Sequence, residues 1–157
     1  MKYLKTEHGK TPVIVEGIFP VTKEEAFEAW TNPDEVVQWL GENPNSMINA
    51  KIDLKVGGKL SLLFIDTEEK TGTLEGKYLE IIENEKLVFD WQFYERFNDG
   101  NEIITEQSIV TIVFKEDPKG TKITLTHSEI DNRDGRLSVG SGWNGTFNNY
   151  ANRIAKT

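Results

Sequence analysis

Apolar side chains follow two different periods along this chain of 157 residues, and each period predicts a different kind of element. Toward the C-terminus they recur every three or four positions, the spacing that places side chains on one face of a helix. This spacing predicts a helix over 137–154, whose inward face is made of Val139, Trp143, Phe147, Tyr150 and Ile154. Three glycines in this stretch disfavour a helix, so the helix must gain its stability from the surface that it packs against.

In the middle of the chain the period is two, which is typical of strands that bury one face. The clearest case is 86–97, where Leu87, Phe89, Trp91 and Phe93 occupy alternate positions. The full set of predicted strands is 12–19, 47–54, 59–65, 71–82, 86–97, 106–116 and 121–128. Because the connections between consecutive strands are short, we expect an antiparallel meander.

Glycines mark places where this regular pairing is expected to change. Gly57 and Gly58 form a two-residue hairpin signal between two predicted strands. Gly72 and Gly76 lie inside a predicted strand and are candidates for bends or bulges. A polar segment, 131–135, is expected to connect the last strand to the C-terminal helix.

Two short helices are predicted between the first strand and the second. Thr22 followed by Glu25 is a capping box, in which each side chain bonds the backbone N–H of the other residue. Asn32 and Pro33 then end this helix and begin another, because asparagine is a good N-cap and proline suits the first helical position. Gly41 is expected to end the second helix. Helices and strands that are segregated along the chain predict an α+β fold.

Composition narrows the classes of function. Acidic side chains outnumber basic ones by 26 to 18 and give a net charge of -8, which disfavours nucleic acid and anionic membranes as partners. The absence of cysteine excludes disulfides and thiolate nucleophiles, and a chain with two histidines is poorly suited to a multi-histidine metal site. We therefore predict no metal, no cofactor and no catalytic residue.

The length favours a single domain over 1–157, with residues 1–10 as a flexible polar arm. The N-terminal stretch lacks the apolar core of a signal peptide. No run approaches the roughly 20 apolar residues that a membrane span requires. We therefore expect a cytoplasmic protein without membrane contact.

Several short stretches share the order and spacing of a known family. They are Phe27-Glu-Ala-Trp-Thr-Asn-Pro33, Trp39-Leu-Gly41, Val56-Gly-Gly58, Gly76-Lys-Tyr-Leu-Glu-Ile81 with Leu87-Val-Phe-Asp-Trp91, Thr124-Leu-Thr-His127 and Gly142-Trp143. Together they resemble the activator of heat-shock protein 90 ATPase homologue-like family over residues 12–155. Two turns depart from the family pattern, since Thr22 and the segment 83–85 stand where the family often has proline.

This resemblance implies an α+β fold of the START-like, helix-grip type. In that fold a curved antiparallel sheet of about six to seven strands wraps around a long C-terminal helix, and two short helices follow the first strand. A cavity often lies between the sheet and the helix. The superfamily includes carriers of apolar ligands, aromatase/cyclase-type proteins and co-chaperone domains, so the resemblance implies a fold more firmly than an activity.

Large apolar side chains on the predicted inward faces are the candidates for lining such a cavity. The candidate ligand-binding residues are Phe64, Phe89, Trp91, Phe93, Ile112, Phe114, Leu125, His127, Trp143, Phe147 and Tyr150. The alternative is that the same side chains fill the space and form a closed core, and the sequence leaves both open. Trp30 and Trp39 are interpreted as packing residues that close one end of the sheet.

His127 shares its strand face with Ile123 and Leu125 and is therefore expected to point inward. A histidine there is suited to anchor a polar ligand group or to act as a general acid or base. The alternative, which we favour, is a core histidine that bonds a backbone group or a hydroxyl. No nucleophile can be paired with it from the sequence.

Three functions stay open at this point. The first is a non-enzymatic protein that binds a small apolar or aromatic ligand between sheet and C-terminal helix, with His127 or Tyr150 orienting a polar end. The second is a stress-related interaction module that contacts a chaperone. The chain corresponds only to the C-terminal domain of eukaryotic activators, which weighs against this hypothesis. The third is a cyclase- or hydrolase-like enzyme that uses the same cavity. A monomer and a homodimer both fit the sequence.

Overall fold

The computed structural model describes residues 12–41, 47–64, 70–130 and 133–155. Its elements, in chain order, are β1 (Val13–Phe19), α1 (Lys23–Thr31), α2 (Pro33–Trp39), β2 (Met47–Ile52), β3 (Lys59–Phe64), β4 (Lys70–Ile82), β5 (Lys86–Phe97), β6 (Glu102–Ile104), β7 (Ser108–Asp117), β8 (Gly120–Ser128) and α3 (Arg133–Ala155). The predicted N-terminal arm, 1–10, lies outside the described residues.

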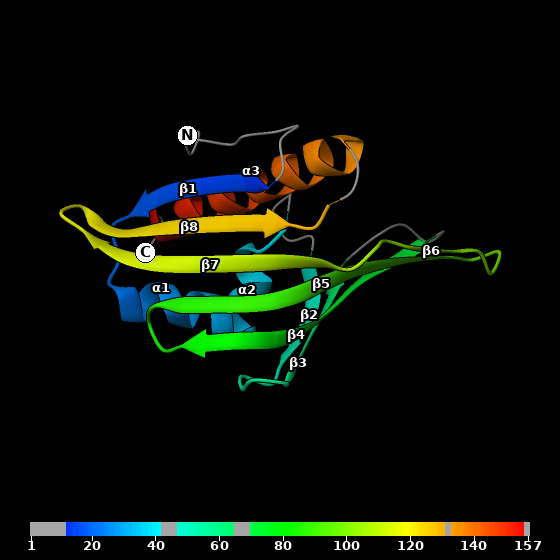
Figure 1. Ribbon diagram of the computed structural model, residues 1–157, viewed down its shortest axis with the longest axis horizontal. Coiled ribbons are helices and arrows are strands. Elements are labelled where there is room, and N and C mark those ends of the chain that lie inside the picture. The colour runs from blue at the N-terminus through cyan, green and yellow to red at the C-terminus, as the bar shows by residue number, and fades with distance from the viewer. Residues whose placement is uncertain (1–11, 42–46, 65–69, 131–132, 156–157) are drawn as a thin grey trace.

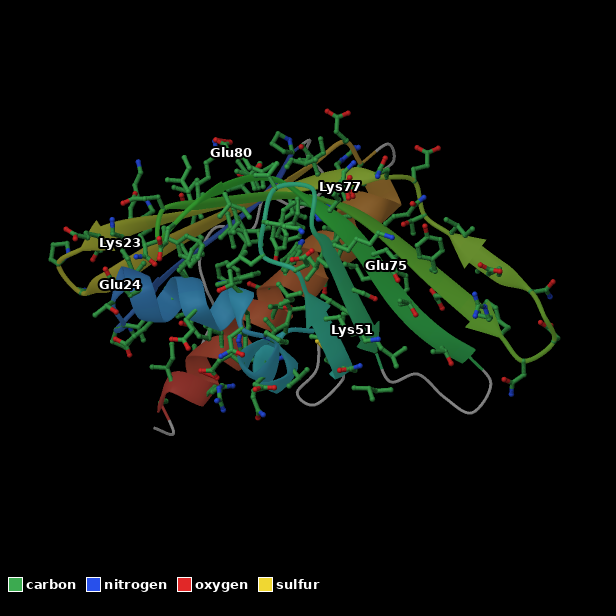
Figure 2. The ribbon with its side chains drawn as sticks, turned by 90° about the horizontal axis from the view of Figure 1, so that it is seen from below. Lys23, Glu24, Lys51, Glu75, Lys77 and Glu80 are labelled. Atoms are coloured by element: carbon green, nitrogen blue, oxygen red, sulfur yellow. The ribbon has the colours of Figure 1, made fainter. Side chains whose placement is uncertain are left out.

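The strands form one antiparallel sheet with the order β1-β8-β7-β5-β4-β3-β2, and β6 pairs with β5 beside this path. All three helices lie on the same side of the sheet (Figure 1). In the view turned by 90°, the strands arch over α3, while α1 and α2 cover the rest of the hollow side (Figure 2). The α+β, helix-grip prediction is therefore confirmed.

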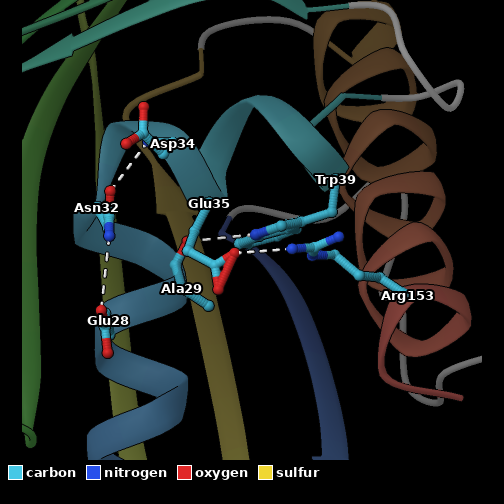
Figure 3. Close-up of polar contacts among 7 residues, drawn as sticks. All are labelled: Glu28, Ala29, Asn32, Asp34, Glu35, Trp39 and Arg153. Atoms are coloured by element: carbon cyan, nitrogen blue, oxygen red, sulfur yellow. Dashed lines mark hydrogen bonds and ion pairs between the residues drawn. The ribbon is translucent and has the colours of Figure 1, made fainter. Parts of the chain in front are cut away.

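The corner between α1 and α2 forms because each helix start carries the cap that the sequence predicted. The Thr22 hydroxyl accepts a hydrogen bond from the Glu25 backbone, and the Glu25 carboxylate accepts one from the Thr22 backbone. Asn32 caps α2 by accepting from the Asp34 N–H at 3.0 Å (Figure 3). The indole of Trp39 then donates to the Ala29 carbonyl at 3.2 Å and ties the second helix back to the first.

Aromatic rings hold α3 against the sheet at the end of the molecule where β1 finishes. Phe19 of β1 packs on Tyr150 of α3, with ring centroids 4.9 Å apart. Trp30 and Trp39 are buried and stack edge to face at 4.7 Å, so their predicted packing role is confirmed. This end of the sheet–helix interface is therefore closed by side chains.

Three local features differ from the sequence-based expectation. The short strand β6 was not predicted, because three residues are too few to show a period. Helix α3 begins at Arg133 rather than 137, and Arg136 donates to the Ile130 carbonyl at 3.1 Å where the chain leaves β8. The register shift in β4 falls between Tyr78 and Glu80 rather than at a glycine.

Candidate functional site

A pocket of about 590 Å³ opens at the other end of the sheet–helix interface, where α3 begins. Strand β5, the β6–β7 connection, the end of β8, the end of α2 and the first half of α3 all contribute to it. The lining residues are Leu40, Gly41, Phe64, Trp91, Phe93, Glu95, Thr105, Glu106, Ser108, Glu129, Ile130, Gly135, Ser138, Val139, Gly142, Trp143 and Thr146. Its size falls in the range of pockets that hold small organic molecules.

The space exists because α3 presents small side chains where it passes over the strands. Gly135, Ser138 and Gly142 follow each other at helical spacing along the pocket wall. A Cβ added to Gly142 would meet nothing within 4 Å, so this glycine faces open space rather than a neighbouring side chain. Larger residues resume on α3 with Trp143 and Phe147, which are both buried.

The structure separates the candidate ligand-binding residues into two groups. Those on the pocket wall are Phe64, Trp91, Phe93 and Trp143. Those that are buried in the core and do not line the pocket are Phe89, Ile112, Phe114, Leu125, His127, Phe147 and Tyr150. The two interpretations of the sequence thus apply to different residues of the same interface, and contact between a ligand and these residues stays a prediction.

His127 does not line the pocket, but both of its ring nitrogens are hydrogen-bonded to residues that do. The indole N–H of Trp143 donates to its Nδ1 at 3.0 Å, and its Nε2 lies 2.7 Å from the Ser108 hydroxyl. Because an indole nitrogen only donates, Nδ1 must be unprotonated and the proton of the neutral ring must be on Nε2. The Ser108 hydroxyl accepts that proton's hydrogen bond and donates to the Trp91 carbonyl at 3.2 Å.

This arrangement does not suit His127 for acid–base chemistry. Burial lowers the pKa of the imidazole from 6.5 to about 3, so the ring is neutral at physiological pH. A histidine that activates a serine must accept the hydroxyl proton at the nitrogen facing it. Here the nitrogen facing Ser108 already carries a proton, so the pair has the wrong tautomer for nucleophilic attack. The interpretation of His127 as a core histidine bonded to a hydroxyl is confirmed.

The sequence analysis missed the polar part of the pocket wall. Ser108 and the three carboxylates of Glu95, Glu106 and Glu129 were not among the candidates. The signal was nevertheless present, because each carboxylate stands two positions beyond an inward-facing residue of β5, β7 or β8. Periodicity therefore placed them on the inward faces, although Glu106 and Glu129 lie just outside β7 and β8.

Gly41 also lines the pocket, and both its backbone N–H and its carbonyl are hydrogen-bonded to side chains of α3. Its N–H donates to the Thr146 hydroxyl at 3.1 Å, and its carbonyl accepts from the Asn149 amide at 2.8 Å. Its φ of 129° lies in the region that favours glycine. Near the same end of α3, Arg153 pairs with Glu35 of α2 at 2.9 Å (Figure 3). These contacts fix the distance between α2 and α3.

The described part of the chain offers neither a metal site nor a membrane-spanning helix. Within 12–41, 47–64, 70–130 and 133–155, no group of three or more histidine, aspartate or glutamate side chains is placed to hold a metal ion. In the same residues, no helix is long and apolar enough to cross a membrane. The cytoplasmic location stays a prediction.

Comparison with known proteins agrees with this architecture. A protein from Rhodobacter sphaeroides has a TM-score of 0.77 at 16% identity, over 98% of this chain and 99% of that one. The AHSA1 protein from Silicibacter pomeroyi reaches 0.71 at 19% identity, over 92% and 97%. CalU16 from Micromonospora echinospora reaches 0.67 at 20% identity, over 92% and 76%. These likenesses show the fold.

Sequence comparison is more specific about the family. None of the curated proteins matches this sequence. The family model described as "Activator of Hsp90 ATPase homolog 1-like protein" matches residues 20–154, which include α1, α2 and all strands from β2 onward. The chain therefore belongs to the family of Activator of Hsp90 ATPase homolog 1-like proteins.

Proposed function

We propose that this protein binds a small, largely apolar or aromatic molecule in the pocket between the sheet and α3, without acting on it chemically. The observation that carries the proposal is the aromatic wall of this pocket. Trp91 and Trp143 line it with ring centroids 5.0 Å apart, and Phe64 and Phe93 line it as a second pair whose ring centroids are 6.2 Å from each other. Rings placed in this way supply flat apolar contact area at a small cost in side-chain entropy.

The size of the effect can be estimated from surface area. A ligand that loses about 200 Å² of apolar surface to water gains about 5 kcal/mol, at roughly 25 cal/mol per Å². The loss of translational and rotational freedom offsets part of that gain, so we expect affinities in the micromolar range for good ligands. Polar groups on the wall then decide which ligands fit.

A library of small aromatic and aliphatic molecules tests the proposal, with binding measured by thermal shift and native mass spectrometry. G142L is the blocking variant, because its side chain enters the space that Gly142 leaves open. N152L is the matched control, since Asn152 is an exposed residue of the same helix that does not line the pocket. We expect ligands that stabilise the wild type and N152L but not G142L. A library without a single hit, or hits that bind G142L equally well, would contradict the proposal.

The family name favours a second candidate, an interaction with the chaperone heat-shock protein 90. The hairpin of β5 and β6 extends away from the helices (Figure 1), and Ile103 and Ile104 on β6 are 54% and 53% exposed. Exposed apolar side chains on a projecting hairpin suit contact with a protein partner. A pull-down with the chaperone compares the wild type with I103S/I104S, and I48S serves as control because Ile48 of β2 is also 54% exposed. Retention of all three proteins alike, or of none, would count against this candidate.

A further inference from the structure

Three hydroxyl groups of the pocket wall already donate their protons in hydrogen bonds within the protein. Each donates to a backbone carbonyl: Ser108 to Trp91 at 3.2 Å, Thr105 to Phe93 at 3.3 Å and Thr146 to Gly142 at 2.9 Å. Each also accepts one hydrogen bond, from His127, Phe93 and Gly41 respectively. A hydroxyl has one proton and two lone pairs, so each can still offer a ligand one acceptor position and no donor. Ser138 is the fourth hydroxyl of the described lining, and its side chain is exposed at the rim.

The charged groups of the wall are acceptors as well. Glu95, Glu106 and Glu129 line the pocket, and an ionised carboxylate accepts hydrogen bonds but donates none. Glu95 and Glu106 also interact elsewhere within the chain. Because a carboxylate has about four acceptor positions, such an interaction leaves room for a ligand. None of the described lining residues is lysine, arginine or histidine.

The positions of acceptors and rings are complementary. Along β5, Trp91 and Phe93 are followed on the same face by Glu95. Glu106 lies two positions before Ser108, the first residue of β7, and lines the pocket with it. The wall therefore changes from aromatic at Trp91 and Phe93 to acidic at Glu95 along β5. Indole faces also attract cations through their quadrupole.

We propose that the pocket selects ligands that donate hydrogen bonds, and in particular aromatic molecules carrying a protonated amine, over the same skeleton carrying a carboxylate. This rests on the proposed binding function and names its ligand class. An amine places N–H donors against a wall whose polar side chains are mostly acceptors, and a positive charge among carboxylates. A carboxylate ligand meets like charge, and along the described wall the side-chain donors left for it are the exposed Ser138 and the indole N–H of Trp91, since the Trp143 N–H is bonded to His127.

Three indoles of nearly equal size test this selection by isothermal titration calorimetry at pH 7 and low salt: tryptamine, 3-ethylindole and indole-3-propionate. We expect tryptamine to bind at least about fivefold more tightly than 3-ethylindole, and indole-3-propionate to bind most weakly. The advantage of tryptamine should shrink as salt is raised, because ions screen partly exposed charges.

Charge variants separate a local effect from the net charge of the protein. In E95Q/E106Q/E129Q, the affinity for tryptamine should fall to within about twofold of that for 3-ethylindole, while the affinity for 3-ethylindole stays unchanged. E28Q/E83Q/E116Q removes the same charge at exposed positions away from the pocket and should keep the preference. Loss of the preference in this control would show that net charge, not the wall, causes it.

The remaining outcomes distinguish the two proposals. If indole-3-propionate binds as tightly as tryptamine and G142L blocks both, the ligand class is wrong and the binding function stands. The same holds if none of the indoles binds while the library yields anionic or neutral ligands that G142L blocks. If neither experiment yields a ligand, both proposals are wrong.

Discussion

His127 joins β8 to β7 and α3 through hydrogen bonds that its neutral form alone can make. Protonation of Nδ1 would turn it into a donor facing the Trp143 N–H, which is also a donor. The hydrogen bond between these two residues would then be lost in the interior of the protein, since the side chain of His127 is only 1% exposed. A residue that sequence reasoning placed among the ligand-binding candidates thus stabilises the wall from behind.

This geometry predicts a specific loss of stability in acid. The pKa of His127 is about 3 in the folded protein and 6.5 as its ordinary value, so between these two pH values the unfolded chain binds a proton that the folded chain does not. The contribution is fully present above pH 6.5 and declines as the pH falls toward 3, by up to about 1.4 kcal/mol per pH unit. Denaturant unfolding from pH 7 to pH 4 measures it.

H127Q is the matched comparison for this measurement. Glutamine can accept from Trp143 and donate to Ser108 without titrating, and all carboxylates are the same in both proteins. The wild type should therefore lose stability relative to H127Q below pH 6.5, while the difference between them stays constant above pH 7. Parallel curves over the whole range would contradict the buried neutral histidine.

Two glycines allow a second prediction at the residue scale. G142A adds a methyl group in open space on a helix, where alanine is favoured over glycine by up to about 1 kcal/mol, so the free energy of unfolding should rise. G76A places its Cβ 2.3 Å from the Asp90 carbonyl oxygen of the neighbouring strand and should be destabilising. Urea titrations of both variants measure the signs, and a destabilised G142A would mean that the space beside it is already filled.

At the scale of the element, α3 is one helix with two differently supported halves. Its first half lies over the pocket and carries Gly135, Gly140 and Gly142. Its second half buries Phe147 and Tyr150, holds Gly41 and pairs with α2. A helix of low intrinsic propensity is stable only where packing supports it.

The two halves should therefore differ in amide hydrogen exchange. We expect faster exchange in residues 135–142 than in 146–153, because the first half has open space on one side. T146V removes the hydroxyl that accepts from Gly41 and should cost about 1–2 kcal/mol and speed exchange in the second half. Exchange that is equally slow along the helix and in the central strands would contradict a loosely supported first half.

The sequence predicted an element correctly where its apolar period ran through the whole element. It failed where contacts between elements determine the boundary or the site. Strand β5, over Lys86–Phe97, has the predicted ends because its alternation runs through the whole strand. The start of α3 was placed too late, because the polar residues 131–135 are typical of a turn. Within the site, the alternation of residues along each strand identified those that point inward. It could not tell whether they fill the core or line a pocket, since that depends on how α3 crosses the strands.

At the scale of the whole molecule, the buried apolar side chains form one continuous cluster that includes residues of all three helices and the sheet. Phe114 of β7 lies at 0% exposure and packs against Phe27 of α1 at 5.6 Å between ring centroids. A shared core makes the elements depend on one another for stability. We propose on this basis that the chain forms a single domain.

A single domain should unfold in one cooperative step. Tryptophan fluorescence reports on α1, α2, β5 and α3 through Trp30, Trp39, Trp91 and Trp143, whereas far-ultraviolet circular dichroism reports on the backbone of every element. The two transitions in urea should coincide. F114A leaves a cavity in the shared core and should lower the free energy of unfolding by about 3–5 kcal/mol, shifting both transitions together because both depend on that core. If fluorescence moved without circular dichroism, the helices and the sheet would be separate cooperative units, and a single domain would be the wrong description.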